Sequence, residues 1–175
     1  MIYEPWVGAE YADARRMLVL GECPHGFLTP DGLPDLSSPS CIRFAKALVG
    51  CRSSLSLASR ACLWNRVAFY AYVQAPLSEP RPRPTSAQLK LSEPAFWLVL
   101  ERLQPRCVVV LGQRLYAAMP GSGCLGERVS GPDGTTFETW VYMLASGGEV
   151  RVLGIDSPSV GFAPEYWHQV LCSFV

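Results

Sequence analysis

Hydrophobic residues gather in three short runs along the chain, and each run ends at a loop of glycine and polar residues. The runs are residues 17–20, 107–112 and 150–155. A run that is apolar on both faces predicts a parallel strand covered by helices on both sides. Ligands of such sheets bind outside the carboxyl ends of the strands, so we expect the loops after these runs to share one edge and to form a site there.

Apolar residues at helical spacing predict three helices. They cover residues 41–49 with Ser40 as N-cap, residues 93–103 after Ser92, and a last segment that starts near Pro164. The second helix is followed at once by a hydrophobic run, which is the crossover unit of a parallel sheet. The chain is therefore predicted to have an α/β fold.

Four other segments show no clear period. Residues 1–11 are predicted to be an arm over the edge of the first strand. Residues 27–40 form a long loop, either a binding lid or disorder. Residues 62–74 are rich in aromatics and predict a buried strand or a helix that leads into one. Residues 75–92 are rich in proline and predict an extended surface crossing.

Composition adds a domain count and an uneven charge. The chain has 175 residues, 49% of them hydrophobic and 17% charged, which favours one domain over residues 1–175 with a sizeable core. The formal net charge is zero, yet residues 42–114 carry eleven basic and three acidic side chains, a net charge of +8, and the flanking segments carry −4 each. This segment predicts either a basic surface that faces phosphates or arginines on solvated helix faces.

Cysteine usage and hydropathy indicate the compartment. The seven cysteines form no CxxC or Cys/His pair with zinc-ligand spacing, so we expect neither a disulfide framework nor a metal site. Residues 1–11 lack the features of a signal peptide, and no apolar run is long enough to span a bilayer. We therefore expect a cytoplasmic protein that is not inserted in a membrane.

The loop after the first run holds the residues best suited to chemistry. Glu22, Cys23 and His25 provide a carboxylate, a thiol and an imidazole within four positions. His25 either acts as a general acid or base or closes the loop. Glu22 either binds substrate or accepts hydrogen bonds from N–H groups of the loop.

Two further groups of residues suit contacts to phosphate. Arg81 and Arg83 are spaced by prolines that hold them away from the chain, although a solvated loop explains them nearly as well. Ser157 and Ser159 follow the third hydrophobic run, where a Pro-Ser turn without a ligand is the alternative.

Several segments, taken in chain order, carry a family resemblance. They are ProTrpValGly with Tyr11, LeuValLeuGlyGluCysProHisGly, TrpAsn…AlaPheTyr…TyrValGln, ArgProThr at residues 83–85, ProArgCysValValValLeuGly, and SerProSer with GlyPhe…TyrTrpHis. Together these segments resemble the uracil-DNA glycosylase superfamily. They are most similar to its small bacterial branch, in which the first loop reads Gly-Glu-Ser-His-Tyr-Gly.

The resemblance implies a fold, an activity and a set of site residues. The fold is a three-layer α/β/α sandwich with a short, mainly parallel sheet, and a pocket in it receives a base flipped out of DNA for hydrolysis of the N-glycosidic bond. No cofactor is implied, and we expect a monomer that binds DNA or a nucleotide. The positions implied as catalytic are Glu22, Cys23, His25 and Asp156. The positions implied as base-binding are Gly21, Phe27, Phe44, Asn65 and Ala71, with Phe27 and Phe44 as alternative stacking aromatics.

The chain departs from the family pattern at three positions. Cys23 stands where members carry a water-activating Asp, so Glu22 or His25 is expected to supply the base. Ala71 stands where an Asn reads the pyrimidine, unless Asn65 takes that role. Asp156 replaces the His of a His-Pro-Ser loop that stabilises the departing base, and only a protonated Asp156 can donate to that anion.

Three functions follow as alternatives. The first is a glycosylase-like enzyme that acts on a damaged or deaminated base. The second is a catalytically inactive protein of the same fold that binds nucleic acid or a nucleotide. The third is a monothiol redox protein that uses Cys23, with its thiol activated at the N-terminus of a helix.

Overall fold

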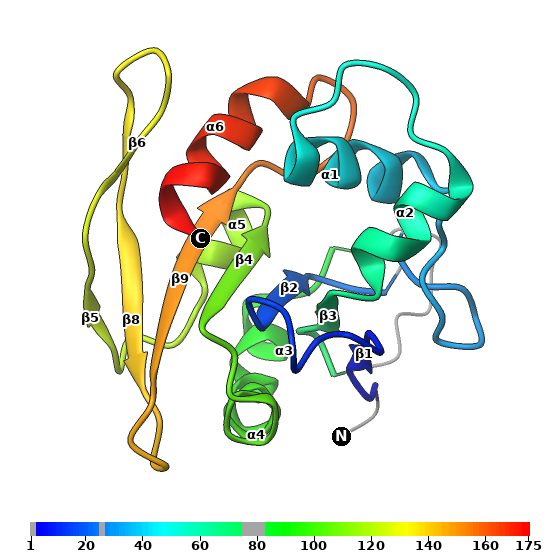
Figure 1. Ribbon diagram of the computed structural model, residues 1–175. Coiled ribbons are helices and arrows are strands. Elements are labelled where there is room, and N and C mark those ends of the chain that lie inside the picture. The colour runs from blue at the N-terminus through cyan, green and yellow to red at the C-terminus, as the bar shows by residue number, and fades with distance from the viewer. Residues whose placement is uncertain (1–2, 25–26, 75–82) are drawn as a thin grey trace.

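Seven strands form one central sheet in the computed structural model, which describes residues 3–24, 27–74 and 83–175. The spatial order is β1-β3-β2-β4-β9-β8-β5 (Figure 1). The strands are β1 (Trp6–Val7), β2 (Met17–Gly21), β3 (Val67–Ala71), β4 (Cys107–Leu111), β5 (Cys124–Leu125), β8 (Thr139–Met143) and β9 (Glu149–Ile155). The four inner strands β3, β2, β4 and β9 are parallel, whereas β1, β8 and β5 pair antiparallel at the two sides. The chain is therefore a mixed α/β protein with a mostly parallel sheet.

Helices cover both faces of this sheet. On one face lie α1 (Pro39–Val49), α2 (Leu57–Trp64) and α6 (Pro164–Phe174), which all contribute to the first hydrophobic core cluster. On the other face lie α3 (Ser86–Leu91), α4 (Glu93–Leu103) and α5 (Gln113–Ala117), which contribute to the second. Figure 1 shows α1 and α6 packed side by side above the sheet and α4 below it.

The strands divide their side chains between the two clusters. In β2, Val19 belongs to the first cluster, whereas Leu18 and Leu20 belong to the second. The same alternation occurs in β4, where Val109 faces the first cluster and Val108 the second. This explains why these runs are apolar at every position, because both faces of a parallel sheet are covered.

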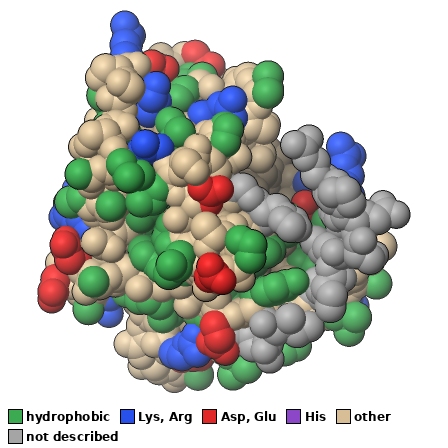
Figure 2. Space-filling model, turned by 90° about the vertical axis from the view of Figure 1, so that its right-hand side faces the viewer, with side chains coloured by type: hydrophobic (Ala, Val, Ile, Leu, Met, Phe, Trp, Pro, Cys, Tyr) green, Lys and Arg blue, Asp and Glu red, His purple; other side chains and the backbone are tan. Residues whose placement is uncertain are grey.

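Outside the main sheet, β6 (Val129–Ser130) and β7 (Thr136–Phe137) form a two-stranded ribbon. Figure 2 shows the opposite side of the molecule, on which α2 and β1 lie in Figure 1. Basic and acidic side chains are interspersed there with hydrophobic ones. Both signs of charge thus occur on the visible part of this side.

Three expectations about local structure need correction. The N-cap of α1 is Ser38, whose side chain accepts a hydrogen bond from the amide of Cys41, because the helix begins earlier, with Pro39 in its first turn. The arm at the start of the chain pairs with β3 rather than with the first predicted strand. The predicted extended crossing contains α3, and residues 75–82 of that segment lie outside the described residues.

Among the described residues, no helix is both long and apolar enough to cross a membrane. Within the same residues, no group of three or more His, Cys, Asp and Glu side chains is arranged to hold a metal ion.

Candidate functional site

A cavity of about 500 Å³ opens at the carboxyl ends of β2, β4 and β9. We call it the carboxyl-edge cavity. It is lined by Gly21, Glu22, Cys23, Phe27, Arg83, Leu111, Gly112, Gln113, Arg114, Leu115, Asp156 and Ser157. Because β2 pairs in parallel with β4, and β4 with β9, the three predicted strands do run side by side in one direction. The prediction that their loops meet at one edge is confirmed.

Glycines allow the chain to turn at this edge. Gly112 has φ = 111°, in the region that favours glycine, and its amide donates a 2.8 Å hydrogen bond to the carbonyl of Ile155. This bond joins the loop after β4 to the end of β9. At Gly21, a Cβ atom would lie 2.8 Å from the ring of Phe69, so a side chain would displace the core.

Phe27 forms an aromatic wall of the cavity. Its ring stacks on Phe69 with centroids 5.1 Å apart and an interplanar angle of 18°. The side chain is 7% exposed. A planar ring is therefore held rigidly at the cavity by the core behind it.

Glu22 and Arg114 form an ion pair across the cavity, with Oε1 and Nη1 3.1 Å apart. The contact has ionic but not hydrogen-bond geometry: Oε1 of Glu22 is buried and accepts no hydrogen bond from any described residue. Arg114 also donates to the carbonyl of Pro84, next to Arg83 in the cavity lining. The Glu22 carboxylate is thus held beside the guanidinium group of Arg114 at the wall of the cavity.

The loop after β9 supplies Asp156 and Ser157, which are both exposed. A side chain of α1 fixes this loop in position, because Nη1 of Arg43 donates to the carbonyl of Pro158 over 3.4 Å. The amide of Ser159 donates to the carbonyl of Ser157 over 2.6 Å. Since Asp156 is exposed, the burial that a neutral carboxyl donor would require is absent.

The structure brings seven of the predicted site residues together in this cavity. They are Gly21, Glu22, Cys23, Phe27, Arg83, Asp156 and Ser157. His25 and Arg81 lie outside the described residues. Ser159 is exposed on the same loop but does not line the cavity, because its chain has already turned back on Ser157.

Three predicted base-binding residues do not line the cavity. Phe44 is fully buried in the first core cluster, where it packs near Trp64. Asn65 ends α2 just before β3 and so lies at the amino end of the parallel strands, away from this edge. Ala71 is at the correct edge, paired with Gly21, but it is 2% exposed and belongs to the core. Of the two aromatics, only Phe27 is placed to contact a ligand here.

The described residues next to Cys23 do not form the helix that was expected to activate its thiol. Cys23 is half-buried in the cavity lining. Activation of the thiol was expected from the N-terminus of a helix, yet the described residues on either side of 25–26 are not helical. The next helix, α1, begins at Pro39.

Sequence reasoning did not select Arg114 and Gln113 as site residues. Both lie at the start of α5, which follows β4 after Gly112, and the Nε2 atom of Gln113 donates to the carbonyl of Gly154 over 3.4 Å. The available signal was their position after an apolar run, which is the same signal that selected Glu22.

The comparisons with known proteins add no identification. No model of a known protein family matches the chain, and a search of curated proteins finds no significant match.

Proposed function

We propose that this protein hydrolyses the N-glycosidic bond of a damaged or deaminated base in nucleic acid, and that Glu22 activates the water. The observation that supports this most directly is the position of Glu22, whose partly exposed side chain lines the cavity and is held there by the 3.1 Å ion pair with Arg114. A carboxylate that is anchored at a cavity wall and reached by solvent is able to orient a water and take its proton.

The remaining walls suit a flipped nucleotide. The ring of Phe27 offers a rigid face on which a base can stack, and such stacking tolerates any base. Arg83 and Arg114 line the same cavity, and because Arg114 is paired with Glu22, the charge of Arg83 is the one that favours a phosphate next to the base. An enzyme needs this arrangement because the glycosidic carbon is inaccessible inside a duplex.

The chemistry requires one proton transfer and the stabilisation of one anion. Water forms a bond to the sugar carbon as the bond to the base nitrogen breaks, and the proton of the water passes to the Glu22 carboxylate. The base leaves as an anion that a hydrogen-bond donor must stabilise. On the loop after β9 the donor available in the cavity lining is the hydroxyl of Ser157, since the Asp156 carboxylate is exposed.

A second function is favoured by the same loop. An ionised Asp156 would repel the departing base, and the buried methyl group of Ala71 offers no group that reads a base edge. These two features favour a protein that binds nucleic acid or a nucleotide in the carboxyl-edge cavity without cleaving it.

The decisive experiment separates these functions with one variant and one control. The protein is incubated with single- and double-stranded oligonucleotides that carry uracil, hypoxanthine or xanthine, and abasic sites are then cleaved. We expect cleavage of at least one substrate, and a loss of about 100-fold or more in Glu22→Gln, since general-base catalysis contributes about 100- to 10,000-fold. Glu138→Gln is the control, because Glu138 is an exposed acid that pairs with Arg128 elsewhere.

Binding measurements complete the comparison. Fluorescence anisotropy with the same oligonucleotides is expected to show retained binding in Glu22→Gln and weaker binding in Arg83→Gln with Arg114→Gln. If the unmodified protein bound these oligonucleotides and cleaved none of them, the second function, binding without cleavage, would be favoured over the enzymatic one. Absence of both would contradict the two functions together.

A further inference from the structure

A second cavity lies at the opposite edge of the sheet, where the parallel strands begin. It has a volume of about 330 Å³, and we call it the amino-edge cavity. Its lining consists of Ala14, Arg15, Met17, Leu48, Leu63, Arg66, Val67, Leu171, Cys172 and Val175. It therefore shares no residue with the carboxyl-edge cavity.

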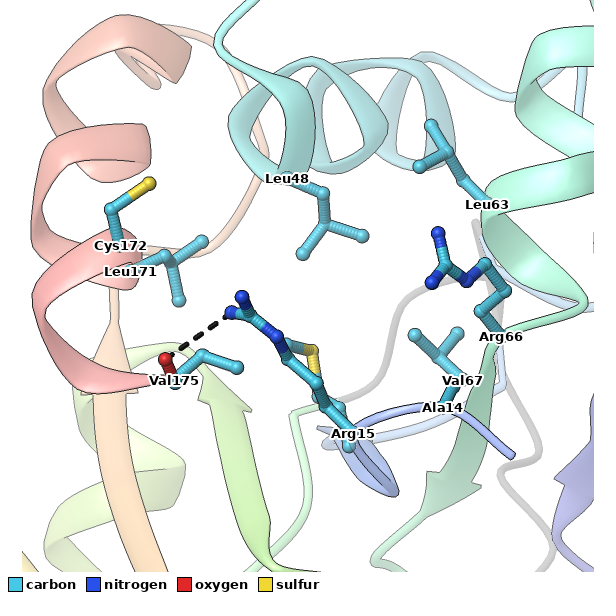
Figure 3. Close-up of a pocket in the computed structure, with 10 residues that line it drawn as sticks. Ala14, Arg15, Leu48, Leu63, Arg66, Val67, Leu171, Cys172 and Val175 are labelled. Carbon is cyan, nitrogen blue, oxygen red and sulfur yellow. Dashed lines mark hydrogen bonds between the residues drawn. The ribbon is translucent and has the colours of Figure 1, made fainter. Parts of the chain in front are cut away.

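The body of the amino-edge cavity is apolar. Met17 and Val67 are paired in register at the starts of β2 and β3 and form its floor. Leu48 of α1, Leu63 of α2 and Leu171 of α6 close it from the helical layer (Figure 3). Such a lining favours a ligand with a hydrophobic body.

Two arginines enter this apolar space from the strand side. Arg66 directly precedes β3, and Arg15 lies two residues before β2, so register places both at the same end of the sheet. Figure 3 shows their guanidinium groups below Leu48, on either side of the hollow. Two positive groups therefore flank one hydrophobic floor.

The two arginines differ in their described contacts. Nη1 of Arg15 donates to the main-chain oxygen of Val175 over 3.2 Å, which leaves its other N–H donors available. The side-chain ion pairs formed by described residues involve Arg52, Arg102, Arg114 and Arg128 instead. Arg66 is thus a cation without a described acidic partner, and Arg15 adds its remaining N–H donors to the same cavity.

We propose that the amino-edge cavity binds a small amphipathic anion, with its aliphatic body on Met17 and Val67 and its carboxylate between Arg15 and Arg66. A volume of about 330 Å³ is near the lower limit for ligand pockets, about 300 Å³, so the ligand is small. The charge of the arginines selects a carboxylate over a neutral head group, and the apolar floor selects a short alkyl chain over an inorganic anion. This proposal is independent of any activity at the carboxyl-edge cavity.

The probe for the test is octanoate, and octanamide is the matched neutral compound of the same chain length. Titration calorimetry is expected to show saturable binding of octanoate and weaker binding of octanamide. Amide shifts in nitrogen-15 NMR spectra are expected at residues 14–17, 63–67 and 171–175. The proposal would be overturned if octanamide bound as tightly as octanoate. It would also be overturned if the amide shifts occurred at Gly21 and Gly112 instead.

Substitutions test the two halves of the site. Arg15→Gln and Arg66→Gln change exposed side chains, and each is expected to weaken octanoate binding roughly three- to tenfold, as for loss of a charge-assisted contact. Leu48→Trp fills the hollow and is expected to abolish binding. Arg106→Gln is the control, because Arg106 is an exposed arginine at the start of β4 that does not line this cavity.

The control defines the remaining outcomes. Octanoate affinity in Arg106→Gln is expected to stay within about twofold of the unmodified protein, since a solvent-screened charge that does not line the cavity contributes little. An equal loss in Arg106→Gln and Arg66→Gln would show only general attraction of an anion to arginine and would overturn the proposal. Absence of saturable binding to the folded, unmodified protein would do the same.

Discussion

The thiols of Cys41 and Cys107 are buried in the hydrophobic core, and this burial raises the pKa of each. Desolvation raises the pKa of Cys107, which starts β4 and is 4% exposed, to about 11. It raises the pKa of Cys41, in the first turn of α1, to about 12. The reference value for both thiols is 9.0. Each thiol therefore ionises at a lower pH in the unfolded chain than in the folded protein.

This difference predicts a loss of stability at alkaline pH. Because the folded pKa of Cys107 lies above its unfolded value, the stabilisation is complete below pH 9 and is lost as the pH rises to about 11. The loss assigned to Cys107 amounts to about 2 to 3 kcal/mol, since one pKa unit corresponds to about 1.4 kcal/mol. Urea unfolding from pH 8 to 11 is expected to show a smaller alkaline loss in Cys107→Ala than in the unmodified protein.

Ionisation of buried tyrosines also contributes above pH 9 in both proteins. The pKa of Tyr11 is raised mainly by burial and in part by the nearby Cys107. The difference between the two pH profiles therefore reports the thiol together with its effect on Tyr11. Parallel profiles would mean that Cys107 ionises as easily in the folded protein as in the unfolded chain.

At the scale of single residues, the sequence predicts which loops hold chemistry better than which side chains meet. Phe27 and Phe44 are equivalent as aromatics near the first loop, and only packing separates them, since Phe44 is on the buried face of α1, in the core. Glu22 and Arg114 are distant in the chain, and their ion pair depends on the pairing of β2 with β4. Periodicity carries no information about such partners.

Among the elements, α3 is a short helix that the hydrophobic pattern of the sequence did not predict. It has six residues and follows a proline-rich stretch, so its helical period is too brief to detect. Its capping box was nevertheless present in the sequence as Thr-Ser-Ala-Gln. The Thr85 side chain accepts from the amide of Gln88, and the Gln88 side chain accepts from the amide of Thr85.

The capping box predicts a measurable contribution from Thr85. Thr85→Ala is expected to destabilise the protein by about 1 kcal/mol, the usual effect of losing an N-cap side chain. Hydrogen exchange of the Gln88 amide is expected to accelerate in the variant, because that amide loses its acceptor. Ser86→Ala changes the next residue, inside the helix, and is expected to have little effect on either measurement.

A loss of stability in Ser86→Ala equal to that in Thr85→Ala would contradict this role for the cap.

The strands with the least sequence signal, β5, β6 and β7, have two residues each and were not predicted as separate strands. Pairs this short are defined by their partners in space, which local propensity does not encode.

For the molecule as a whole, the sequence predicts the layer type but not the order of the strands. Runs apolar on both faces indicated a covered parallel sheet, and this is confirmed. The placement of the first parallel strand, β2, between β3 and β4 depends on which crossovers the chain makes. Several such orders satisfy the same hydrophobic pattern, so the amino-edge cavity between β2, β3 and the helices had no signal in the sequence.

The sharing of strands between both core clusters predicts that the two faces unfold together. Trp64 and Trp167 belong to the first cluster, and Trp97 packs against the second. With fluorinated tryptophan, fluorine NMR reports each of these residues separately during urea unfolding. We expect one common midpoint for all three signals, as in a single cooperative domain.

A matched pair of substitutions makes this test stringent. Val170 in α6 and Val99 in α4 are fully buried on opposite faces of the sheet. Val170→Ala and Val99→Ala are each expected to destabilise by about 1 to 3 kcal/mol through a small cavity, and each is expected to lower the midpoints of all three tryptophans together. If Val99→Ala lowered only the midpoint of Trp97, the helices on that face would unfold as a separate unit, because the shared strands would no longer couple the two layers.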